Sequence, residues 1–212
     1  MDFFRVDGKL YQFLSRFWEI LKLNFFWLLF SLPIVTIGAA TTAAFRVTLD
    51  MVEEKEGYVF QTFLKAFREN WKKGTLIGFL NVLLAYAVYL DFEFFRKLSG
   101  NQVVFLIFGM FGTALCVASF LYAYALTARY DNSVRNTLKN SFRISVRYFG
   151  RTLLLLLVLA VELLVWWFNS TTIFLGLLVG PATCILTISG PAMHIFRAIE
   201  KEERGGDVTY EE

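Results

Sequence analysis

Long runs without a charged side chain constrain this fold most strongly. The 212-residue chain has no Asp, Glu, Lys or Arg in 23–45, 74–90, 98–128, 152–161 and 163–196. A helix of about 20 apolar residues crosses a hydrocarbon layer of about 30 Å, so the last two runs, separated only by Glu162, are long enough for two crossings. Only 18% of the residues are charged and 57% are hydrophobic, which excludes an ordinary soluble domain. We predict an all-α, polytopic transmembrane helical bundle.

Residues 11–52 could cross the membrane once or twice, because Pro33 and Gly38 interrupt a long apolar stretch. With two crossings and both termini in the cytoplasm, the cytoplasmic segments 1–22, 46–73, 129–151 and 197–212 hold 4, 6, 6 and 3 of the 21 Lys and Arg residues. With one crossing and an external N-terminus, the count falls to 15 inside and 6 outside. The positive-inside rule favours six crossings, in a multi-pass protein of a bacterial-type cell membrane.

The predicted bundle consists of three hairpins, with helices near 11–32, 34–52, 74–91, 100–128, 152–169 and 172–197. They form a single transmembrane domain, 1–200, followed by an acidic cytoplasmic tail, 201–212. Two further amphipathic helices are predicted in the cytoplasm near 58–73 and 131–149, because residues 62–76 and 137–153 share an order of Leu, Lys, Phe, Arg, aromatic, Gly, Thr and Leu. One apolar face of each is expected to hold Phe60, Phe63, Leu64, Phe67 and Trp71 in the first copy, and Val134, Leu138, Phe142 and Phe149 in the second.

Basic side chains flank both amphipathic segments. In the second copy they stand at four-residue spacing: Arg135, Lys139, Arg143, Arg147 and Arg151. In the first copy the candidates are Lys65 and Arg68. Such residues can anchor a helix to anionic lipid or dock a partner, such as a transporter subunit or another membrane protein. We expect the lipid bilayer to be the main partner and leave docking as the alternative.

Two polar residues inside apolar runs are candidates for a substrate contact or proton relay. Glu162 lies near the middle of its predicted span, where an ionised carboxylate costs at least about 2.5 kcal/mol, and Asn81 lies about 10 Å into the third span. Each could equally be a hydrogen bond between helices that fixes packing. The single histidine, His194, is predicted to pack at the inner interface.

Pro33, Thr36 and Gly38 form a helix-break motif. Broken membrane helices can expose backbone groups that bind a substrate, but the simpler interpretation here is a turn between two helices. The chain has no phosphate-binding glycine loop, no zinc-protease motif, no nucleophile elbow and no recognised nucleic-acid-binding motif. We expect no enzyme activity, no metal, no cofactor and no nucleic-acid partner.

The stretch LNFFWLLFSLPIVTIGAATTAAFRV, residues 23–47, resembles the N-terminal signature of the YesL family of bacterial membrane proteins. The segments TFLKAFRENWKK and LKNSFRISVRYFGRTLL resemble that family's two cytoplasmic segments, so the likeness covers most of residues 10–200. Gly38 is followed by Ala39, where the family usually has proline. The resemblance implies a small multi-pass protein encoded beside carbohydrate uptake and polysaccharide breakdown systems. We therefore expect a component or accessory of carbohydrate uptake; the alternative is a scaffold that recruits partners through its basic helices.

Overall fold

The computed structural model describes residues 9–55, 57–97 and 102–207, and these residues contain helices and no strand. The elements are α1 (Lys9–Ser31), a 3-10 turn (Ile34–Thr36), α2 (Ile37–Val52), α3 (Val59–Lys97), α4 (Gln102–Ala118), a π-helical segment (Ser119–Ala123), α5 (Tyr124–Arg129), α6 (Val134–Arg147), α7 (Phe149–Trp166) and α8 (Ser170–Asp207). The predicted all-α class is confirmed.

Five helical stretches of the described chain are long and apolar enough to cross a membrane. They are Ile34–Val52, Val59–Lys97, Val103–Arg129, Phe149–Trp166 and Ser170–Glu202. Helix α1 is not among them, because Arg16, Glu19 and Lys22 interrupt its apolar run. The multi-pass architecture is therefore confirmed, whereas a sixth crossing through α1 and the cytoplasmic position of the termini stay predictions.

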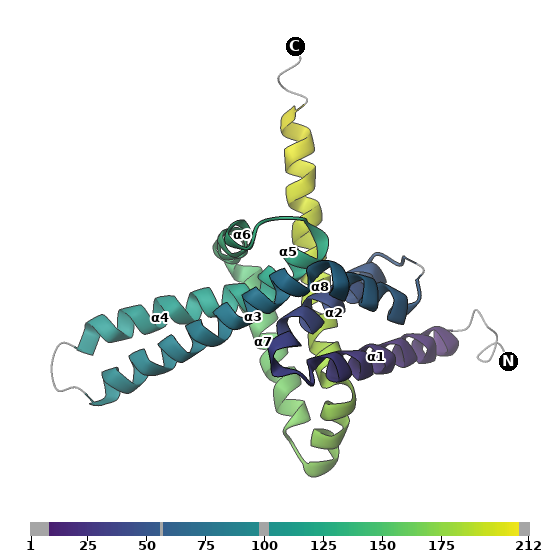
Figure 1. Ribbon diagram of the computed structural model, residues 1–212, viewed down its shortest axis with the longest axis horizontal. Coiled ribbons are helices and arrows are strands. Elements are labelled where there is room, and N and C mark those ends of the chain that lie inside the picture. The colour runs from purple at the N-terminus through teal and green to yellow at the C-terminus, as the bar shows by residue number, and fades with distance from the viewer. Residues whose placement is uncertain (1–8, 56, 98–101, 208–212) are drawn as a thin grey trace.

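Two helix pairs project in different directions from a central region (Figure 1). The α3–α4 pair points to the left in this view, the α7–α8 pair points downward, and the C-terminal end of α8 extends upward. We call these two pairs the arms. We call α2, with the surfaces of α1, α3, α5 and α8 that contact it, the junction.

Small residues make α2 the buried centre of the junction. Gly38, Ala39, Ala40, Ala43 and Ala44 are all buried. A Cβ added to Gly38 would lie 2.2 Å from the carbonyl oxygen of Gly74, so only glycine permits this crossing of α2 and α3. The two helices pack backbone against backbone, as small residues allow in membrane proteins.

The two copies of the predicted repeat fold differently. Residues 58–73 do not form a separate helix: they are the start of α3, which continues without interruption to Lys97. The second copy keeps a break, since Tyr148, with φ −108° and ψ 39°, separates α6 from α7. The first copy has no such break because Gly74 stays helical beneath α2. The prediction of a separate cytoplasmic helix is thus wrong for the first copy, while the second copy forms the separate helix α6.

The buried faces of these segments also differ from the predicted ones. In α3 the buried residues are Phe63, Ala66, Gly74 and Ile77. In α6 they are Thr137, Ser141 and Ile144. Phe60, Trp71 and Phe149, predicted on the apolar faces, are 45%, 49% and 66% exposed. In α6 close packing thus selects the small Thr137 and Ser141, whereas in α3 the bulky Phe63 is buried, as predicted.

Helix α8 contains Pro181 and Pro191 without ending at either. Proline has no N–H, and its ring disturbs the preceding turn, so Pro181 leaves the carbonyls of Leu177 and Leu178 and the N–H of Ala182 without regular partners. Asn24 of α1 binds all three: its Nδ2 donates to Leu177 O (3.0 Å) and Leu178 O (2.8 Å), and its Oδ1 accepts from Ala182 N (3.2 Å). The side chain of Asn24 therefore fastens α1 to the kink in α8.

Helix α8 also extends beyond its predicted end at residue 197, as far as Asp207. The first residues of the predicted acidic tail are thus helical. Residues 208–212 of that tail lie outside the described residues.

Candidate functional site

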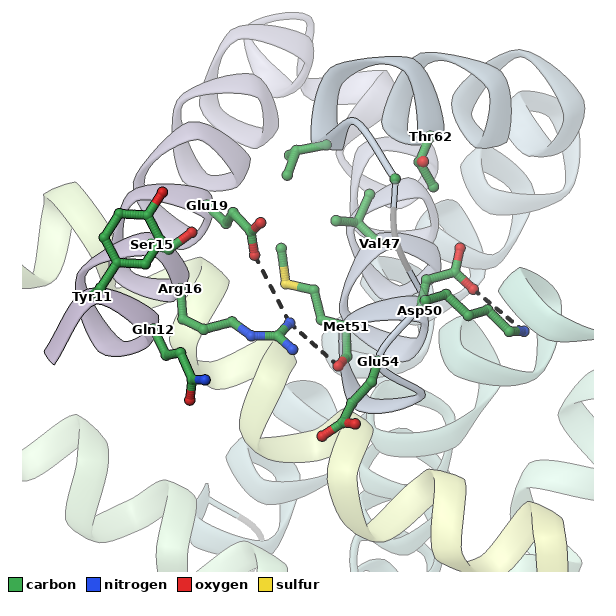
Figure 2. A pocket seen from close by; sticks show the side chains of 13 residues that line it. Tyr11, Gln12, Ser15, Arg16, Glu19, Val47, Asp50, Met51, Glu54 and Thr62 are labelled. Carbon is green, nitrogen blue, oxygen red and sulfur yellow. Dashed lines mark hydrogen bonds and ion pairs between the residues drawn. The ribbon is translucent and has the colours of Figure 1, made fainter. Parts of the chain in front are cut away.

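A polar crevice of about 490 Å³ lies between α1, the end of α2 and the start of α3 (Figure 2). Helix α1 contributes Tyr11, Gln12, Ser15, Arg16 and Glu19; α2 and the chain after it contribute Val47, Asp50, Met51, Glu54, Lys55 and Gly57; and α3 contributes Val59 and Thr62. The lining offers carboxylates, an amide, hydroxyls and cations, and the aromatic ring of Tyr11 lies beside the polar groups of α1. A cavity of this size and polarity suits a small polar solute.

Aromatic packing and one turn set the shape of the crevice. Phe26 and Phe30 of α1 pack against α3: the ring centroid of Phe26 lies 4.8 Å from that of Phe60, and that of Phe30 lies 4.9 Å from that of Phe67. On the opposite wall Glu54 takes a positive φ of 54°, which turns the chain sharply after α2. This turn places Lys55 back over α2, where its N–H donates to Asp50 O at 3.0 Å.

Arg16 spans the crevice. It donates to the carbonyl oxygen of Met51 at 3.4 Å and lies 3.8 Å from the carboxylate of Glu19 (Figure 2). Both charged side chains remain partly exposed, at 48% and 32%. An exposed pair of this kind contributes little to stability, so the two groups are available to hydrogen-bond a solute.

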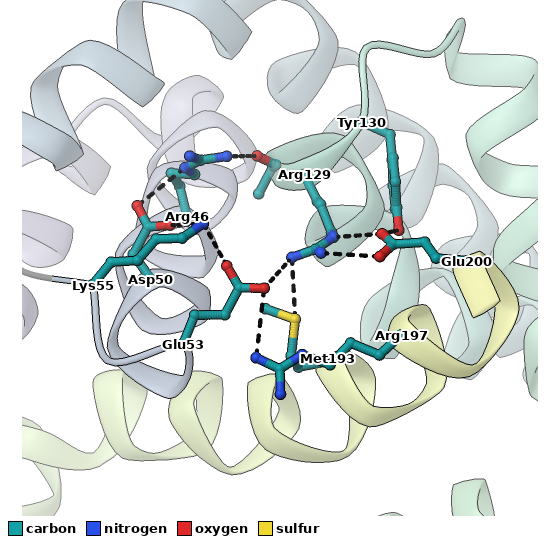
Figure 3. A network of polar contacts seen from close by, with 10 residues as sticks. Arg46, Asp50, Glu53, Lys55, Arg129, Tyr130, Met193, Arg197 and Glu200 are labelled. Carbon is teal, nitrogen blue, oxygen red and sulfur yellow. Dashed lines mark hydrogen bonds and ion pairs between the residues drawn. The ribbon is translucent and has the colours of Figure 1, made fainter. Parts of the chain in front are cut away.

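Beside the crevice, a network of charges joins α2, α5 and α8 (Figure 3). Arg129 is its centre, with Nη1 at 2.9 Å from Glu53 and Nε at 3.1 Å from Glu200. Tyr130 donates a short hydrogen bond to the same Glu200 carboxylate, and Lys55 pairs with Glu53 at 2.5 Å. Three elements that are distant in the sequence are therefore held together where α2 ends.

The network shifts two proton equilibria. The hydrogen bond from Lys55, together with the hydrogen bond and charge of Arg129, lowers the pKa of Glu53 to about 2 against the opposing effect of burial. Burial raises the pKa of Tyr130 to about 12, and its hydrogen bond to Glu200 adds to that rise. Glu53 is thus a carboxylate, and Tyr130 a neutral hydrogen-bond donor, at any physiological pH.

The side chains of the crevice and the network can form hydrogen bonds and ion pairs. No group of three or more His, Cys, Asp or Glu side chains in residues 9–55, 57–97 and 102–207 is arranged to hold a metal ion. His194 is exposed on the surface of this chain, and its packing at the inner membrane interface stays a prediction.

The basic residues that the sequence singled out lie on the surface. Arg135, Lys139, Arg143 and Arg147 are exposed along one face of α6, and Arg147 Nη2 reaches Glu202 of α8 at 2.8 Å. Arg151 and Arg147 both lie over the Tyr148 ring, at 5.5 and 5.7 Å from its centroid. Lys65 and Arg68 are exposed on α3, away from this cluster. The structure therefore gathers the α6 residues into one stripe and leaves the α3 pair apart.

Glu162 and Asn81 have separate partners. Thr187 of α8 donates to Glu162 Oε2 at 3.1 Å, with Cys184 beside it, while Asn81 donates to the hydroxyl of Tyr124 at 3.0 Å. Glu162 belongs to the α7–α8 arm and Asn81 to α3, so the structure does not join them in one path. A substrate or relay role for either residue stays a prediction.

The helix-break motif forms a turn. Thr36 Oγ1 donates to Phe30 O and Pro33 O, both at 2.7 Å, and so closes the chain between α1 and α2. Gly38 then packs against Gly74. These contacts occupy the groups that a broken helix would otherwise present to a substrate.

Sequence reasoning missed the crevice, Asn24 and the Arg129 network. Asn24 is 1% exposed. In the sequence it is one polar residue in an aromatic run, and nothing there indicates its partners. The ends of predicted spans hold Glu53, Arg129 and Glu200. Charged residues are expected there in any membrane protein, so their position gave no sign of a network. A signal did exist in Pro181: a proline within a membrane helix requires some side chain to take the freed backbone groups.

Comparison with known proteins supports the resemblance found in the sequence. Residues 20–92 match the family described as "Protein of unknown function, DUF624". The chain is 26% identical over 156 residues to the uncharacterized protein YesL of Bacillus subtilis (strain 168), an alignment that covers 71% of this chain and 73% of that protein. No solved structure matches this chain significantly. The chain is therefore similar, over most of its length, to an uncharacterized protein, and over residues 20–92 to a family of unknown function.

Proposed function

We propose that this chain is a component or accessory of carbohydrate uptake across a bacterial inner membrane. The observation that carries the proposal is the crevice between α1, α2 and α3. Gln12, Ser15 and Arg16 can donate hydrogen bonds, Glu19 and Asp50 can accept them, and Tyr11 offers an aromatic face. Sugar hydroxyls both donate and accept, and so require such a mixed set of side chains.

An accessory role fits the contacts better than a pathway through this chain alone. The backbone groups freed at Pro181 are bound by Asn24, and Glu162 is bound by Thr187. The small-residue core of α2 is closely packed. Polar side chains such as these line the route of a transported solute in other membrane proteins, whereas here Asn24 and Glu162 are each bound by another helix.

Sugar binding to the purified protein tests this proposal. Labelled mono- and oligosaccharides are titrated against the full chain in neutral detergent, with dissociation constants from equilibrium dialysis. We expect saturable binding that weakens about tenfold or more in Tyr11→Ala/Gln12→Leu, because two contacts worth about 1 kcal/mol each are lost. Tyr58→Ala is the matched control, since Tyr58 is 77% exposed and does not line the crevice. Equal binding by both variants, or none by the native chain, contradicts the proposal.

The second candidate is a scaffold that recruits partners and moves no solute. The exposed basic stripe of α6 supports it. A scaffold predicts a protein that co-purifies from native membranes with the native chain and is lost with Arg135→Gln/Lys139→Gln. A sugar-binding accessory predicts that the crevice variant alone changes uptake by the associated transporter.

A further inference from the structure

A second cleft, of about 430 Å³, lies between α6, the turn after α5 and the C-terminal part of α8. Its apolar part includes Ile144, Phe196 and Ile199. Its polar part includes the guanidinium groups of Arg143 and Arg147 and the amides of Asn132 and Asn140. The cleft therefore combines two cations and two amide donors with an apolar floor.

Among the described residues that line this cleft, one is acidic, and it is engaged elsewhere. Glu200 accepts from Arg129 at 3.1 and 3.4 Å and from the hydroxyl of Tyr130, so its charge is balanced from the side of the network. Arg147 pairs with Glu202 at 2.8 Å, but the two side chains are 59% and 55% exposed. An exposed pair of this kind is weak and exchanges readily for a better ligand. The cleft therefore keeps a net positive charge.

The position of the cleft also suits an anion with an apolar attachment. Helix α5 ends at Arg129, α7 begins at Phe149 just after α6, and the charge-free run of α8 ends at Phe196. The cleft therefore opens where apolar spans meet water, at the depth of phospholipid headgroups. Basic pockets between helices at this depth bind lipid phosphates.

We propose that this cleft binds the phosphate group of an anionic phosphate ester. Arg143 and Arg147 pair with the phosphate oxygens, as arginine does in planar, two-pronged contacts, and Asn140 donates from its amide. The carbon part of the ester lies on Ile144, Phe196 and Ile199. A phospholipid headgroup and a soluble phosphate ester share this chemistry.

The experiment uses the purified full chain in neutral detergent. Thermal shift and native mass spectrometry measure binding of phosphatidylglycerol, phosphatidylcholine and glycerol phosphate. We expect phosphatidylglycerol to bind more tightly than phosphatidylcholine, and Arg143→Gln/Arg147→Gln to weaken it roughly 30-fold, the effect of two cations near an anionic surface. Competition by glycerol phosphate at millimolar concentration assigns a soluble ester, and its absence assigns the lipid.

Arg135→Gln/Lys139→Gln is the matched control, because it removes the same charge from the same stripe outside the cleft. We expect this control to lose less than threefold. Asn140→Leu keeps the charge and removes one donor, and we expect a loss of about threefold to tenfold. If Arg143→Gln/Arg147→Gln and Arg135→Gln/Lys139→Gln weaken phosphate binding equally, the attraction is diffuse and the site is wrong. The absence of binding of any phosphate ligand would also overturn the site. The crevice variant Tyr11→Ala/Gln12→Leu should leave phosphate binding unchanged, so this proposal and the sugar proposal fail separately.

Discussion

The junction and the arms are stabilised by different means. In the apolar stretch of α2, 61% of the residues are buried inside the protein, whereas in that of α3, which forms one side of an arm, 6% are buried. On the arms, large apolar side chains are more than half exposed: Phe79, Val82, Leu83 and Phe108 on α3 and α4, and Leu154, Leu157 and Leu164 on α7.

This difference shows where the sequence specifies contacts and where the bilayer replaces them. Lipid tails are as apolar as leucine, so exposed apolar surface on the arms needs no protein partner. In the junction the contacts are specific: Gly38 on Gly74, Asn24 on the α8 kink, and the Thr48–Ser189 hydroxyl pair at 2.6 Å. We therefore expect substitutions in the junction to be costly and those on the arms to be mild.

The largest effect is expected for Gly38→Leu. A side chain at this position collides with the backbone of α3, which cannot yield without separating the two helices. Overpacking of buried sites typically costs about 1–3 kcal/mol, and a collision with backbone belongs at or above the top of that range. Unfolding of the detergent-solubilised protein by heat or SDS measures the loss.

Gly190→Ala is the control for this substitution, since a Cβ there meets no atom within 4 Å. We expect its stability to change by less than about 1 kcal/mol, in the stabilising direction that helix propensity gives. Equal stability of Gly38→Leu and the native chain would contradict the close packing of α2 on α3.

Asn24→Leu comes next. It leaves the N–H of Ala182 and two carbonyls of α8 without their partner. A buried polar group left unpaired lowers the free energy of unfolding by about 1–3 kcal/mol. Pro181→Ala restores the N–H that proline lacks and lets α8 form its own bonds. The double variant should thus be more stable than Asn24→Leu alone, and a double-mutant cycle measures this coupling. Simple additivity of the two changes would show that Asn24 does not serve the kink.

The sequence predicts the membrane class and most helix positions, because hydrophobic length and charge placement act locally. It fails where two distant segments meet. The continuous α3 depends on Gly74 lying under Gly38, and the buried face of α6 depends on small Thr137 and Ser141 rather than on the aromatic residues. No periodicity within one segment reports such contacts.

The candidate site was predicted only in part. The basic stripe of α6 is visible from four-residue spacing, and the structure keeps it on one exposed face. The crevice and the second cleft need α1, α6 and α8 to be placed relative to other helices. That placement is set by the Arg129 network and by Asn24, whose partners are more than 60 residues away.

A pH titration separates the charged end of the junction from the apolar arms. The folded pKa of Glu53, about 2, lies below its ordinary value of 4.5, so its contribution to stability is complete above that value and is lost as the pH falls from about 4.5 toward 2. In Glu53→Gln the midpoint of thermal unfolding should be lower at pH 7 and should fall less between pH 5 and 3. Arg96→Gln, at the 77% exposed tip of an arm, should follow the native curve.

Glu162→Gln is expected to have the smallest effect, and it tests the arms directly. Glutamine keeps an oxygen that can accept from Thr187, so the α7–α8 contact survives. Hydrogen bonds between membrane helices contribute about 0.6 kcal/mol on average, and the expected loss of stability lies below that value. Glu162→Leu removes the acceptor and should lower stability slightly more.

If Glu162 instead carries protons, Glu162→Gln leaves stability unchanged but abolishes the proton flux that the native chain supports in liposomes. Loss of stability beyond about 2 kcal/mol in Glu162→Gln would show that this arm is held by a specific polar contact, as the junction is, and that the contrast between the two regions is wrong.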